Sequence, residues 1–359
     1  MQKPTPKTIS SNLAVYGISH ALIDLICAAV VFSIAKNKIV NPSDFLTLVL
    51  IYNLAAFGLQ SVLGLIVDYF KSPRIATLLG FFLASLSALT FSIYPLLAII
   101  SAGVGNALFH IGGGTISLNL TPKKAAAPGI FVAPGAVGLL IGILMGKGGN
   151  FVSWPFIIAL SILAILILTI KHPEIDYKKP QKQEDEINYF LLIFILIFLS
   201  IIIRSFIGFI VSFPWKSDMN LLIILTAAVV LGKGLGGIFA DKFGWIKTAT
   251  ITLLLSIPLL VFGPNNYILG IVGMFLFNMT MPVTLVALSN AIPGRPAFAF
   301  GLTCLALIIG SFPTFTGTKL FFADPVFISI IIFISATALF GGLELLINNR
   351  VFSYNKKVN

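Results

Sequence analysis

A short polar segment, Gly64-Leu-Ile-Val-Asp68-Tyr-Phe-Lys71-Ser-Pro-Arg74, occurs a second time as Gly237-Ile-Phe-Ala-Asp241-Lys-Phe-Gly-Trp-Ile-Lys247. In both copies a glycine precedes the aspartate by four residues, a phenylalanine follows it by two, and a basic residue follows it by six. Each copy lies between two long apolar runs. Because the same spacing of residues recurs so far apart in the chain, the sequence predicts two similar halves that follow one another.

The composition around these segments is that of a membrane protein. Hydrophobic residues make up 58% of the 359 residues, charged residues make up 10%, and the mean hydropathy is +1.04. A helix needs about 20 apolar residues to cross the hydrocarbon of a bilayer. The chain therefore has room for about twelve crossings and for no separate soluble domain.

The apolar runs follow one another with short connections, except at one place. They fall near 11–36, 44–68, 75–94, 96–119, 125–146, 152–170, 188–212, 219–240, 246–263, 267–291, 297–316 and 326–347. The long hydrophilic segment between the sixth and seventh runs is typical of a solvated linker. The predicted organisation is thus an all-α membrane protein with an N-terminal half (1–171), a linker (172–187) and a C-terminal half (188–359).

The formal net charge of +11 is explained by topology. Sixteen lysine and arginine residues fall on the side of the N-terminus and five on the other side. By the positive-inside rule, both termini and the linker are expected on the cytoplasmic side of the membrane. The membrane expected is an inner membrane of bacterial type. We therefore expect a lipid bilayer, and no nucleic acid, as the partner of this basic chain.

Neither the cysteines nor the N-terminus changes this interpretation. Cys27 and Cys304 lie inside apolar runs, so they indicate neither a disulfide framework nor a metal cluster. No small-residue cleavage site follows a short apolar region at the start of the chain, which favours an uncleaved first crossing.

Twelve crossings with the repeated segment after the second and eighth resemble the major facilitator superfamily. Its cytoplasmic loop signature is typically Gly-x-x-x-Asp-x-x-Gly-Arg-x-Arg. Here Lys71 stands at the second glycine of the first copy and Pro73 interrupts the basic pair, whereas Gly244 is kept in the second copy. The resemblance implies two six-helix pseudo-symmetric halves that expose a central site alternately to the two sides.

Several short stretches are most similar to fosmidomycin-resistance-type drug and proton antiporters. They are His20-x-x-x-Asp24, Gly105-Asn-Ala-Leu-Phe-His110, Ile203-Arg204-Ser205, Met281-Pro-Val-Thr284 and Pro293-Gly-Arg-Pro-Ala-Phe-Ala-Phe-Gly-Leu-Thr303. The resemblance implies proton-coupled export of small molecules.

The repeated loops are candidate gates. A glycine one turn before an aspartate lets another helix approach, and the carboxylate can cap a helix N-terminus or pair with a base. The family implies that such loops hold the cytoplasmic side closed in the outward-facing state. The alternative is that both aspartates simply end their helices. The gate residues proposed on this basis are Gly64, Asp68, Arg74, Gly237, Asp241 and Lys247.

Six ionisable residues lie inside the apolar runs, where their burial costs several kcal/mol unless they face a wet cavity or a partner. They are His20, Asp24, His110, Arg204, Lys233 and Glu344. In the family fold the first, fourth, seventh and tenth helices line the central cavity, and the first four of these residues fall on three of those helices. Glu344 is close to the end of its run and is expected at the cytoplasmic interface.

His20 and Asp24 are four residues apart and share one helical face. A carboxyl in a dehydrated cavity and an imidazole can both titrate within the physiological range. Asp24 is therefore the preferred proton carrier, with His20 as its partner. The alternative is that His20 bonds a neighbouring helix and Asp24 is a fixed counter-ion.

Arg204 lies in mid-helix, too far from either end to snorkel easily. Asp24 is one candidate partner, either in a permanent ion pair or in competition with a substrate acid or phosphonate. Such competition would couple substrate binding to protonation of Asp24.

The remaining polar positions are weaker candidates for the substrate site. His110, among glycines, either lines the cavity or packs between helices, and no zinc or other metal site is recognisable. Gln60 and Lys233 occupy equivalent positions of the two halves, before Asp68 and Asp241. Asn278 belongs to a polar and methionine-rich surface suited to a small amphipathic solute.

The fifth run carries glycines at four-residue spacing, Gly138, Gly142 and Gly146, after Pro134. Such a face permits close packing, and the proline frees a backbone carbonyl. This helix is similar to the Gly/Pro helix of superfamily antiporters, so Pro134 and Gly138 are candidate gating residues. Simple packing glycines are the alternative.

The sequence therefore predicts a secondary active transporter, functional as a monomer, that exports a small organic molecule in exchange for protons, with Arg204 pointing to an anion. The alternatives are proton-coupled uptake of an organic anion and a non-transporting membrane sensor or assembly partner. No nucleophile with a base and no Gly-Lys-Ser/Thr phosphate loop is present, so neither an enzyme nor an ATP-driven pump is expected, and no cofactor.

Overall fold

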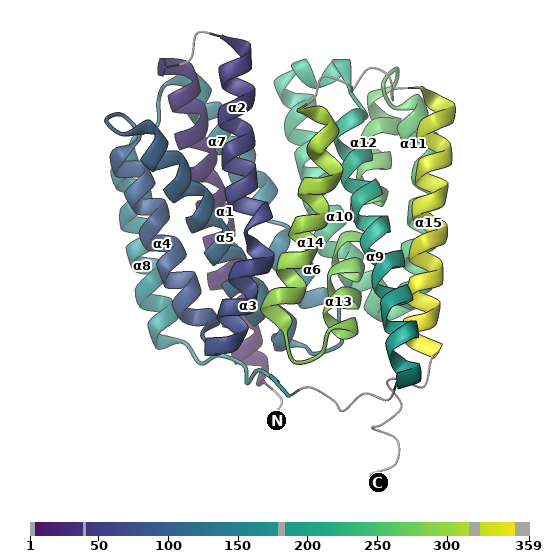
Figure 1. Cartoon of the computed structure of the whole chain (residues 1–359). Helices are drawn as coiled ribbons and strands as arrows, with labels where there is room; N and C mark the ends of the chain where they lie inside the picture. The colour runs from purple at the N-terminus through teal and green to yellow at the C-terminus, as the bar shows by residue number, and fades with distance from the viewer. Residues whose placement is uncertain (1–3, 39–40, 179–183, 316–323, 349–359) are drawn as a thin grey trace. The chain divides into compact units, whose positions relative to one another are not determined.

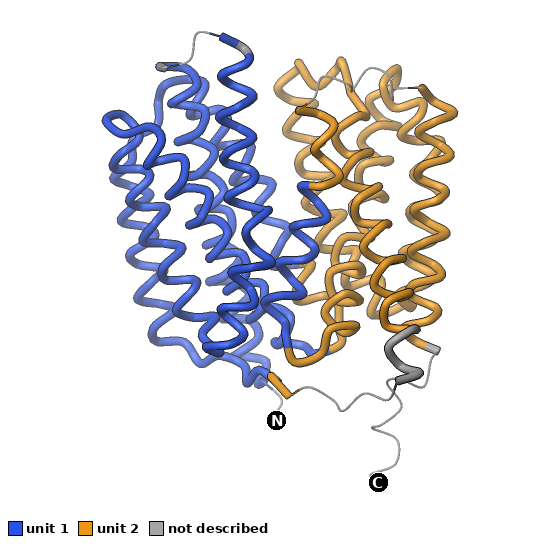
Figure 2. Tube along the Cα trace, in the orientation of Figure 1, with its two compact units in different colours: residues 1–122, 130–176, 295–308 blue, residues 123–129, 177–294, 309–359 orange. Residues whose placement is uncertain are grey.

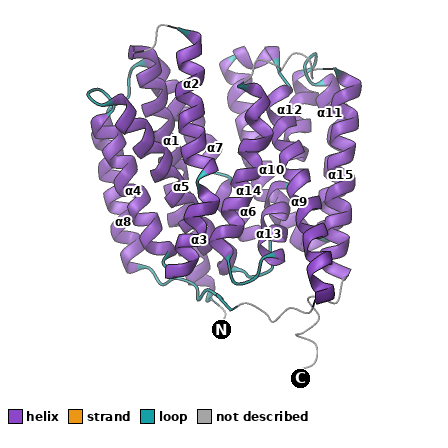
Figure 3. Ribbon diagram, in the orientation of Figure 1, coloured by secondary structure: helices purple, strands orange, loops and turns teal. Residues whose placement is uncertain are grey.

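The computed structural model describes residues 4–38, 41–178, 184–315 and 324–348, and over these ranges it contains helices, turns and loops but no strand (Figures 1 and 3). The α-helices of the first half are α1 (Pro6–Lys38), α2 (Pro42–Asn53), α3 (Gln60–Phe70), α4 (Pro73–Thr90), α5 (Pro95–Leu120), α6 (Ala126–Val132), α7 (Gly135–Gly148) and α8 (Ser153–Thr169). Those of the second half are α9 (Glu184–Ile210), α10 (Met219–Phe243), α11 (Trp245–Phe262), α12 (Tyr267–Asn278), α13 (Met281–Ala291), α14 (Pro296–Ser311) and α15 (Pro325–Asn348).

These helices form the predicted series of membrane crossings. Eleven stretches of the described chain are long and apolar enough to span a bilayer, and α8, with 17 residues, is a shorter apolar helix in the sixth position. Large apolar side chains such as Ile93, Leu96 and Phe82 are more than 60% exposed on the surface. An outward apolar surface of this kind is expected where the solvent is lipid.

Within the residues that the structure describes, three crossings are interrupted along their length. A π-helical turn, Leu54–Gly58, separates α2 from α3. The fifth crossing breaks between α6 and α7 at Pro134, and the tenth breaks between α12 and α13 just before Pro282. Proline lacks the N–H that would continue the helical ladder, so both breaks follow from the sequence.

The described chain divides into two compact units (Figure 2). The described residues of unit 1 fall within 1–122, 130–176 and 295–308, and those of unit 2 fall within 123–129, 177–294 and 309–359. Each unit thus includes a short segment from the other half of the sequence. Part of the predicted linker, residues 179–183, lies outside the described residues, as do several basic residues that entered the topology prediction: Lys3, Lys179, Lys182, Lys319, Arg350, Lys356 and Lys357.

In unit 1, helix α1 is the centre of the packing. It contacts α5 and α7 along much of its length, and α4 and α8 more locally. In unit 2, α9 packs against α15, and α15 packs against α11. Some of the buried positions of α1 and α5 carry polar side chains, including His20 and His110. The candidate site therefore lies inside unit 1.

Candidate functional site

The three ionisable residues predicted in the first and fourth crossings form one cluster. The Nε2 atom of His20 lies 3.3 Å from Oδ2 of Asp24, and Nε2 of His110 lies 3.8 Å from Oδ1 of Asp24. The two imidazoles contact each other through their Nε2 atoms at 2.9 Å. Their side chains are 5% and 8% exposed, whereas that of Asp24 is 18% exposed. The carboxylate is therefore the most accessible member of the cluster.

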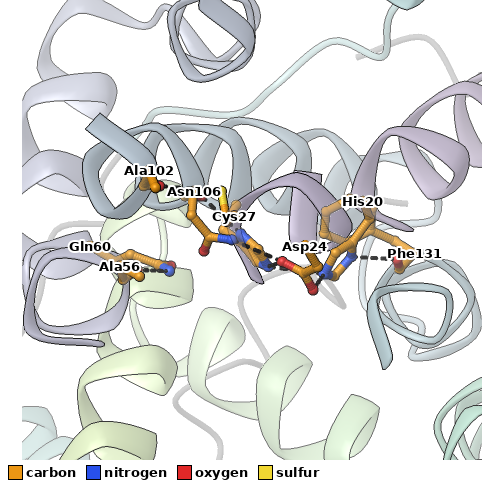
Figure 4. A network of polar contacts seen from close by, with 9 residues as sticks. His20, Asp24, Cys27, Ala56, Gln60, Ala102, Asn106 and Phe131 are labelled. Atoms are coloured by element: carbon orange, nitrogen blue, oxygen red, sulfur yellow. Dashed lines mark hydrogen bonds and ion pairs between the residues drawn. The ribbon is translucent and has the colours of Figure 1, made fainter. Parts of the chain in front are cut away.

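Backbone and amide groups hold the cluster in place (Figure 4). His20 Nδ1 lies 2.8 Å from the carbonyl oxygen of Phe131, and His110 Nδ1 lies 2.8 Å from the carbonyl oxygen of Asn106. The Asn106 side-chain amide donates a hydrogen bond to Oδ1 of Asp24 at 2.9 Å. Both rings and the carboxylate are thus oriented by groups that do not titrate.

Sequence reasoning missed two of these supporting groups. Asn106 is four residues before His110 and so shares its helical face, a spacing that could have revealed it. The Phe131 carbonyl lies in the last turn of α6, just before the Pro134 break, where carbonyls have no partner within the helix. Its contact with His20, which is distant in sequence, had no sequence signal.

Gly135, the first residue of α7, allows this close approach. A Cβ atom at Gly135 would overlap the imidazole of His20 and the carboxylate of Asp24. The position therefore requires the residue without a side chain.

Gln60 lies in the same unit, at the start of α3. It is fully buried, and its Nε2 donates a hydrogen bond to the Ala56 carbonyl at 2.6 Å in the π-helical turn (Figure 4). Its Oε1 has no hydrogen-bond partner among the described residues.

Arg204 lies in unit 2, on α9. It is 9% exposed; one of its terminal nitrogens donates to Thr284 Oγ1 at 3.2 Å, and its guanidinium lies 5.7 Å from the ring centre of Phe277. Within the described part of unit 2, no carboxylate forms an ion pair with Arg204, and its Nε has no hydrogen-bond partner. The predicted relation between Arg204 and Asp24 spans the two units and stays a prediction.

The other candidates for substrate contact in unit 2 are half-buried. Asn278 donates a hydrogen bond to the Met274 carbonyl of its own helix at 2.8 Å. Lys233 lies on α10, and its backbone carbonyl faces Gly129. A Cβ atom at Gly129 would be 2.7 Å from the Lys233 carbonyl oxygen.

The first copy of the loop repeat caps a helix. Asp68 accepts hydrogen bonds from the backbone N–H groups of Ala297 (3.1 Å) and Phe298 (2.9 Å), at the beginning of α14. A Cβ at Gly64 would be 2.5 Å from the Ala297 carbonyl oxygen. The glycine therefore admits the helix end that the aspartate caps.

The second copy has the same geometry within unit 2. Asp241 accepts hydrogen bonds from the backbone N–H groups of Ala125 (2.8 Å) and Ala126 (2.9 Å), where α6 begins. A Cβ at Gly237 would overlap the Ala125 carbonyl. Trp245 donates a further hydrogen bond to Asp241 at 3.2 Å. Of the two roles considered for the aspartates, capping a helix or pairing with a base, the structure shows the cap.

The basic ends of the two copies differ. Arg74 donates to the carbonyl of Leu168 near the end of α8, a favourable place for a cation. Lys247 is exposed. Lys71 adopts the left-handed conformation with a φ of 51°, and Gly244 has a φ of 99°. These positive angles explain why glycine is usual at this position of the signature.

The glycine face of the fifth crossing packs on α1. Cβ atoms at Gly138, Gly142 and Gly146 would meet the backbone carbonyls of Ala21, Leu25 and Ala29, respectively. Both series advance by four residues, so the two helices contact backbone to backbone over two turns.

Two further features bear on ligands. His20, Asp24 and His110 each offer one ligand atom, and these atoms lie within 4.8 Å of one another. The described residues add no fourth histidine, cysteine or carboxylate to this group, and the two Nε2 atoms are already in direct contact at a hydrogen-bond distance of 2.9 Å, so the expectation of no metal site is kept. A separate pocket of about 380 Å³ between α1, α7 and α8 has an apolar lining.

Of the comparisons with known proteins, the one with solved structures bears on the architecture. No protein-family model and no curated protein matches the sequence. Among solved structures, the chain is similar to FucP, described as a major facilitator superfamily transporter in the outward conformation, with a TM-score of 0.66 and 13% identity over 94% of this chain and 98% of that one. The chain has the major facilitator fold.

A variant of the E. coli fucose:proton symporter FucP also shares the major facilitator fold, with a TM-score of 0.62 and 14% identity over 92% of this chain and 98% of that one. The predicted fold class is therefore confirmed. At these identities the likeness concerns the fold. It gives no support to the narrower resemblance to fosmidomycin-resistance-type exporters, which stays a prediction.

Proposed function

We propose that this chain is a secondary active transporter that works by alternating access and exports a small organic anion in exchange for protons. The observation that carries the proposal is the His20–Asp24–His110 cluster, a set of titratable groups in the first and fourth crossings of a major facilitator fold. Ionisable groups inside membrane helices are costly and usually mark a transport or proton pathway.

Coupling is assigned to His20 and Asp24 because each side chain changes its charge by one unit when it takes up or releases a proton. The partly exposed carboxylate provides contact with water, whereas both imidazoles are enclosed. Gain or loss of a proton in a poorly solvated site changes its electrostatic energy strongly. Such a change in energy is sufficient to favour the conformation that is open to one side of the membrane over the conformation that is open to the other side.

The anionic class of substrate is suggested by Arg204. Its buried guanidinium has a neutral hydroxyl and an aromatic ring as its contacts within unit 2, and its Nε is free of a described partner. A carboxylate or phosphonate would supply the missing acceptors in bidentate geometry. Gln60, His110, Lys233 and Asn278 are further proposed contacts for the substrate.

The two capped loops are proposed as gate elements. In alternating access, the contacts that close one side must break when the site opens to that side. The hydrogen bonds that each carboxylate accepts from two backbone N–H groups are strong enough to hold a closed state and few enough to be released. We place the loops, the linker and both termini on the cytoplasmic side of a bacterial-type inner membrane. We expect the monomer to be functional.

Binding and coupling can be tested in two steps. Purified protein is screened for thermal stabilisation by small organic anions and their neutral analogues at pH 5.5 and pH 7.5. Ligands that stabilise it are then followed in proteoliposomes with a pH gradient imposed in either direction. We expect an anion whose uphill movement needs the gradient, and whose binding Arg204→Gln weakens by about ten- to a hundredfold.

Asp24→Asn should abolish gradient-driven accumulation while exchange of bound ligand continues. The exposed Asp44 on α2 supplies a matched control, because Asp44→Asn makes the same chemical change outside the cluster. Accumulation with the proton gradient rather than against it would favour the uptake alternative. An unchanged pH response in Asp24→Asn would contradict proton coupling at this cluster.

A further inference from the structure

The hydrogen bonds of the two buried histidines determine where their protons lie. Nδ1 of His20 faces the Phe131 carbonyl and Nδ1 of His110 faces the Asn106 carbonyl, each at 2.8 Å. A carbonyl oxygen only accepts hydrogen bonds, so both Nδ1 atoms must carry a hydrogen. A neutral imidazole has one N–H, and in the neutral form each ring would present a bare lone pair at Nε2.

These two Nε2 atoms face each other at 2.9 Å. Two lone pairs repel at that separation, whereas a nitrogen–hydrogen–nitrogen bond is favourable at the same distance. The hydrogen between them cannot come from Nδ1 of either ring, because both Nδ1 atoms are engaged. The contact therefore requires one proton more than two neutral rings contain.

Asp24 supplies the compensating charge. Its carboxylate oxygens lie 3.3 Å and 3.8 Å from the two Nε2 atoms, and Oδ1 also accepts the Asn106 amide. With the extra proton the cluster is neutral overall; without it, the cluster carries one negative charge. Since the rings are almost fully enclosed, the neutral form is the one suited to a poorly solvated site.

Among the described residues, three further titratable side chains interact with Asp24: Cys27 on α1, Tyr52 on α2 and Cys304 on α14. Thiols and phenols are ordinarily uncharged at neutral pH. The α6–α7 segment contributes a backbone carbonyl and Gly135.

We propose that the His20–His110 pair is the proton-binding site, that it holds one proton between its two Nε2 atoms, and that Asp24 is the counter-ion that positions this proton. The proposal rests on the proposed function and moves the carrier from Asp24 to the histidine pair. The structure corresponds to the proton-loaded form.

Loss of the proton has a mechanical consequence. Two lone pairs and a carboxylate would then face one another in a space closed by Gly135. Relief requires either that α1 and α5 separate or that a ring rotates and leaves its carbonyl. Because the carbonyl for His20 lies on α6 beside the Pro134 break, deprotonation would act directly on the interrupted crossing.

Nuclear magnetic resonance of ¹⁵N-labelled histidine tests the proposal without a known substrate. The chain has three histidines, and His172→Gln leaves the pair alone in the spectrum. At pH 7 we expect Nδ1–H on both rings and a nitrogen–nitrogen coupling through one shared Nε2 proton. Raising the pH should remove one proton per chain, with both rings responding at a common midpoint.

Two variants in this background sharpen the test. In His110→Gln the amide can donate to the Nε2 lone pair of His20, so we expect a neutral His20 at pH 7. Asp24→Asn removes the counter-ion and should also remove the shared proton at pH 7. Asp44→Asn should leave the histidine spectrum unchanged.

The opposite results are equally clear. Two independent midpoints, or a neutral ring with its hydrogen on Nε2, would overturn the shared proton. Signals that need added Zn²⁺ and disappear with a chelator would show a metal ion in its place. If the shared proton is found but His110→Gln retains gradient-driven transport, the coupling role fails and the proton site stands. If the spectrum contradicts the pair while Asp24→Asn abolishes coupling, the proposed function stands and this inference fails.

Discussion

His172, the third histidine, lies just beyond the end of α8 and shows how one residue connects the linker to the first crossing. Its Nε2 lies 3.0 Å from the hydroxyl of Tyr16 on α1, and the neighbouring Lys171 carbonyl accepts a hydrogen bond from Asn12 at 2.8 Å. Burial, together with the positive charge of Arg74, lowers the pKa of His172 from its ordinary value to about 4. The neutral ring is therefore the form compatible with this contact.

The lowered pKa of His172 predicts a pH dependence of stability. Above pH 6.5 the ring is neutral whether the chain is folded or unfolded, so its stabilising contribution is complete. Between pH 6.5 and about 4 the unfolded chain binds a proton that the folded chain does not, and this contribution is lost. We expect about 1 kcal/mol, less than the full shift implies, because solvent screens the half-buried ring.

Thermal unfolding in detergent at pH 7.5 and pH 5 measures this effect. The wild type should lose more stability on acidification than His172→Gln, in which an uncharged acceptor replaces the ring. Equal losses in the two proteins would show that protonation of His172 does not matter for the fold.

At the scale of elements, the contact between α1 and α7 positions the His20–Asp24–His110 cluster, the proposed proton site. The glycine face of α7 lies on the α1 carbonyls of Ala21, Leu25 and Ala29, and Ala21 is next to His20 in sequence. The first turn of α7 also carries Gly135 against the cluster. The packing of α7 on α1 therefore also determines how the histidine pair is oriented.

Gly138→Ala tests this dependence. The added methyl would overlap the Ala21 carbonyl, and we expect a loss of about 1–3 kcal/mol in the free energy of unfolding together with weaker proton-driven transport. Gly208→Ala on α9 is the control, because nothing lies within 4 Å of its Cβ position. Normal stability and transport in Gly138→Ala would show that α1 and α7 can separate without cost.

At the scale of the whole molecule, the repeated loop marks the pseudo-symmetry of the fold. Asp68 caps α14 within unit 1, and Asp241 caps the beginning of α6 within unit 2. Each aspartate thus holds a helix from the other half of the sequence. The compact units are for this reason not identical with the two sequence halves (Figure 2).

Asp68→Asn and Asp241→Asn should each cost about 1 kcal/mol of stability, since an amide NH2 group replaces one of the two carboxylate oxygens that accept backbone N–H groups. The two sites lie in different units, so independent caps predict a double variant whose loss is the sum to within about 0.5 kcal/mol. Chemical denaturation of the single and double variants, with Asp44→Asn as an exposed control, measures this. A clear departure from additivity would mean that the two caps are coupled through the rest of the protein.

The sequence by itself determined the class of the protein and the position of its symmetric features. Apolar runs of membrane-spanning length leave the backbone little choice but helices, so the crossings and their order could be predicted. The recurrence of Gly64 and Asp68 as Gly237 and Asp241 indicated two halves. A turn of this kind is determined by residues that are close together in the sequence, so its repetition can be recognised without the structure.

Tertiary structure alone decided which helix each aspartate caps, and it brought His110 to His20. These contacts join residues far apart in the chain, and neither spacing nor composition encodes such distances. The same reason explains why the sequence favoured Asp24 as the proton carrier, which stays a prediction: its neighbour His20 is four residues away, whereas the contacts of the Phe131 and Asn106 carbonyls with the two rings follow only from the packing. Where a proton can reside depends on those hydrogen-bond partners, and their positions become known only when the helices are packed.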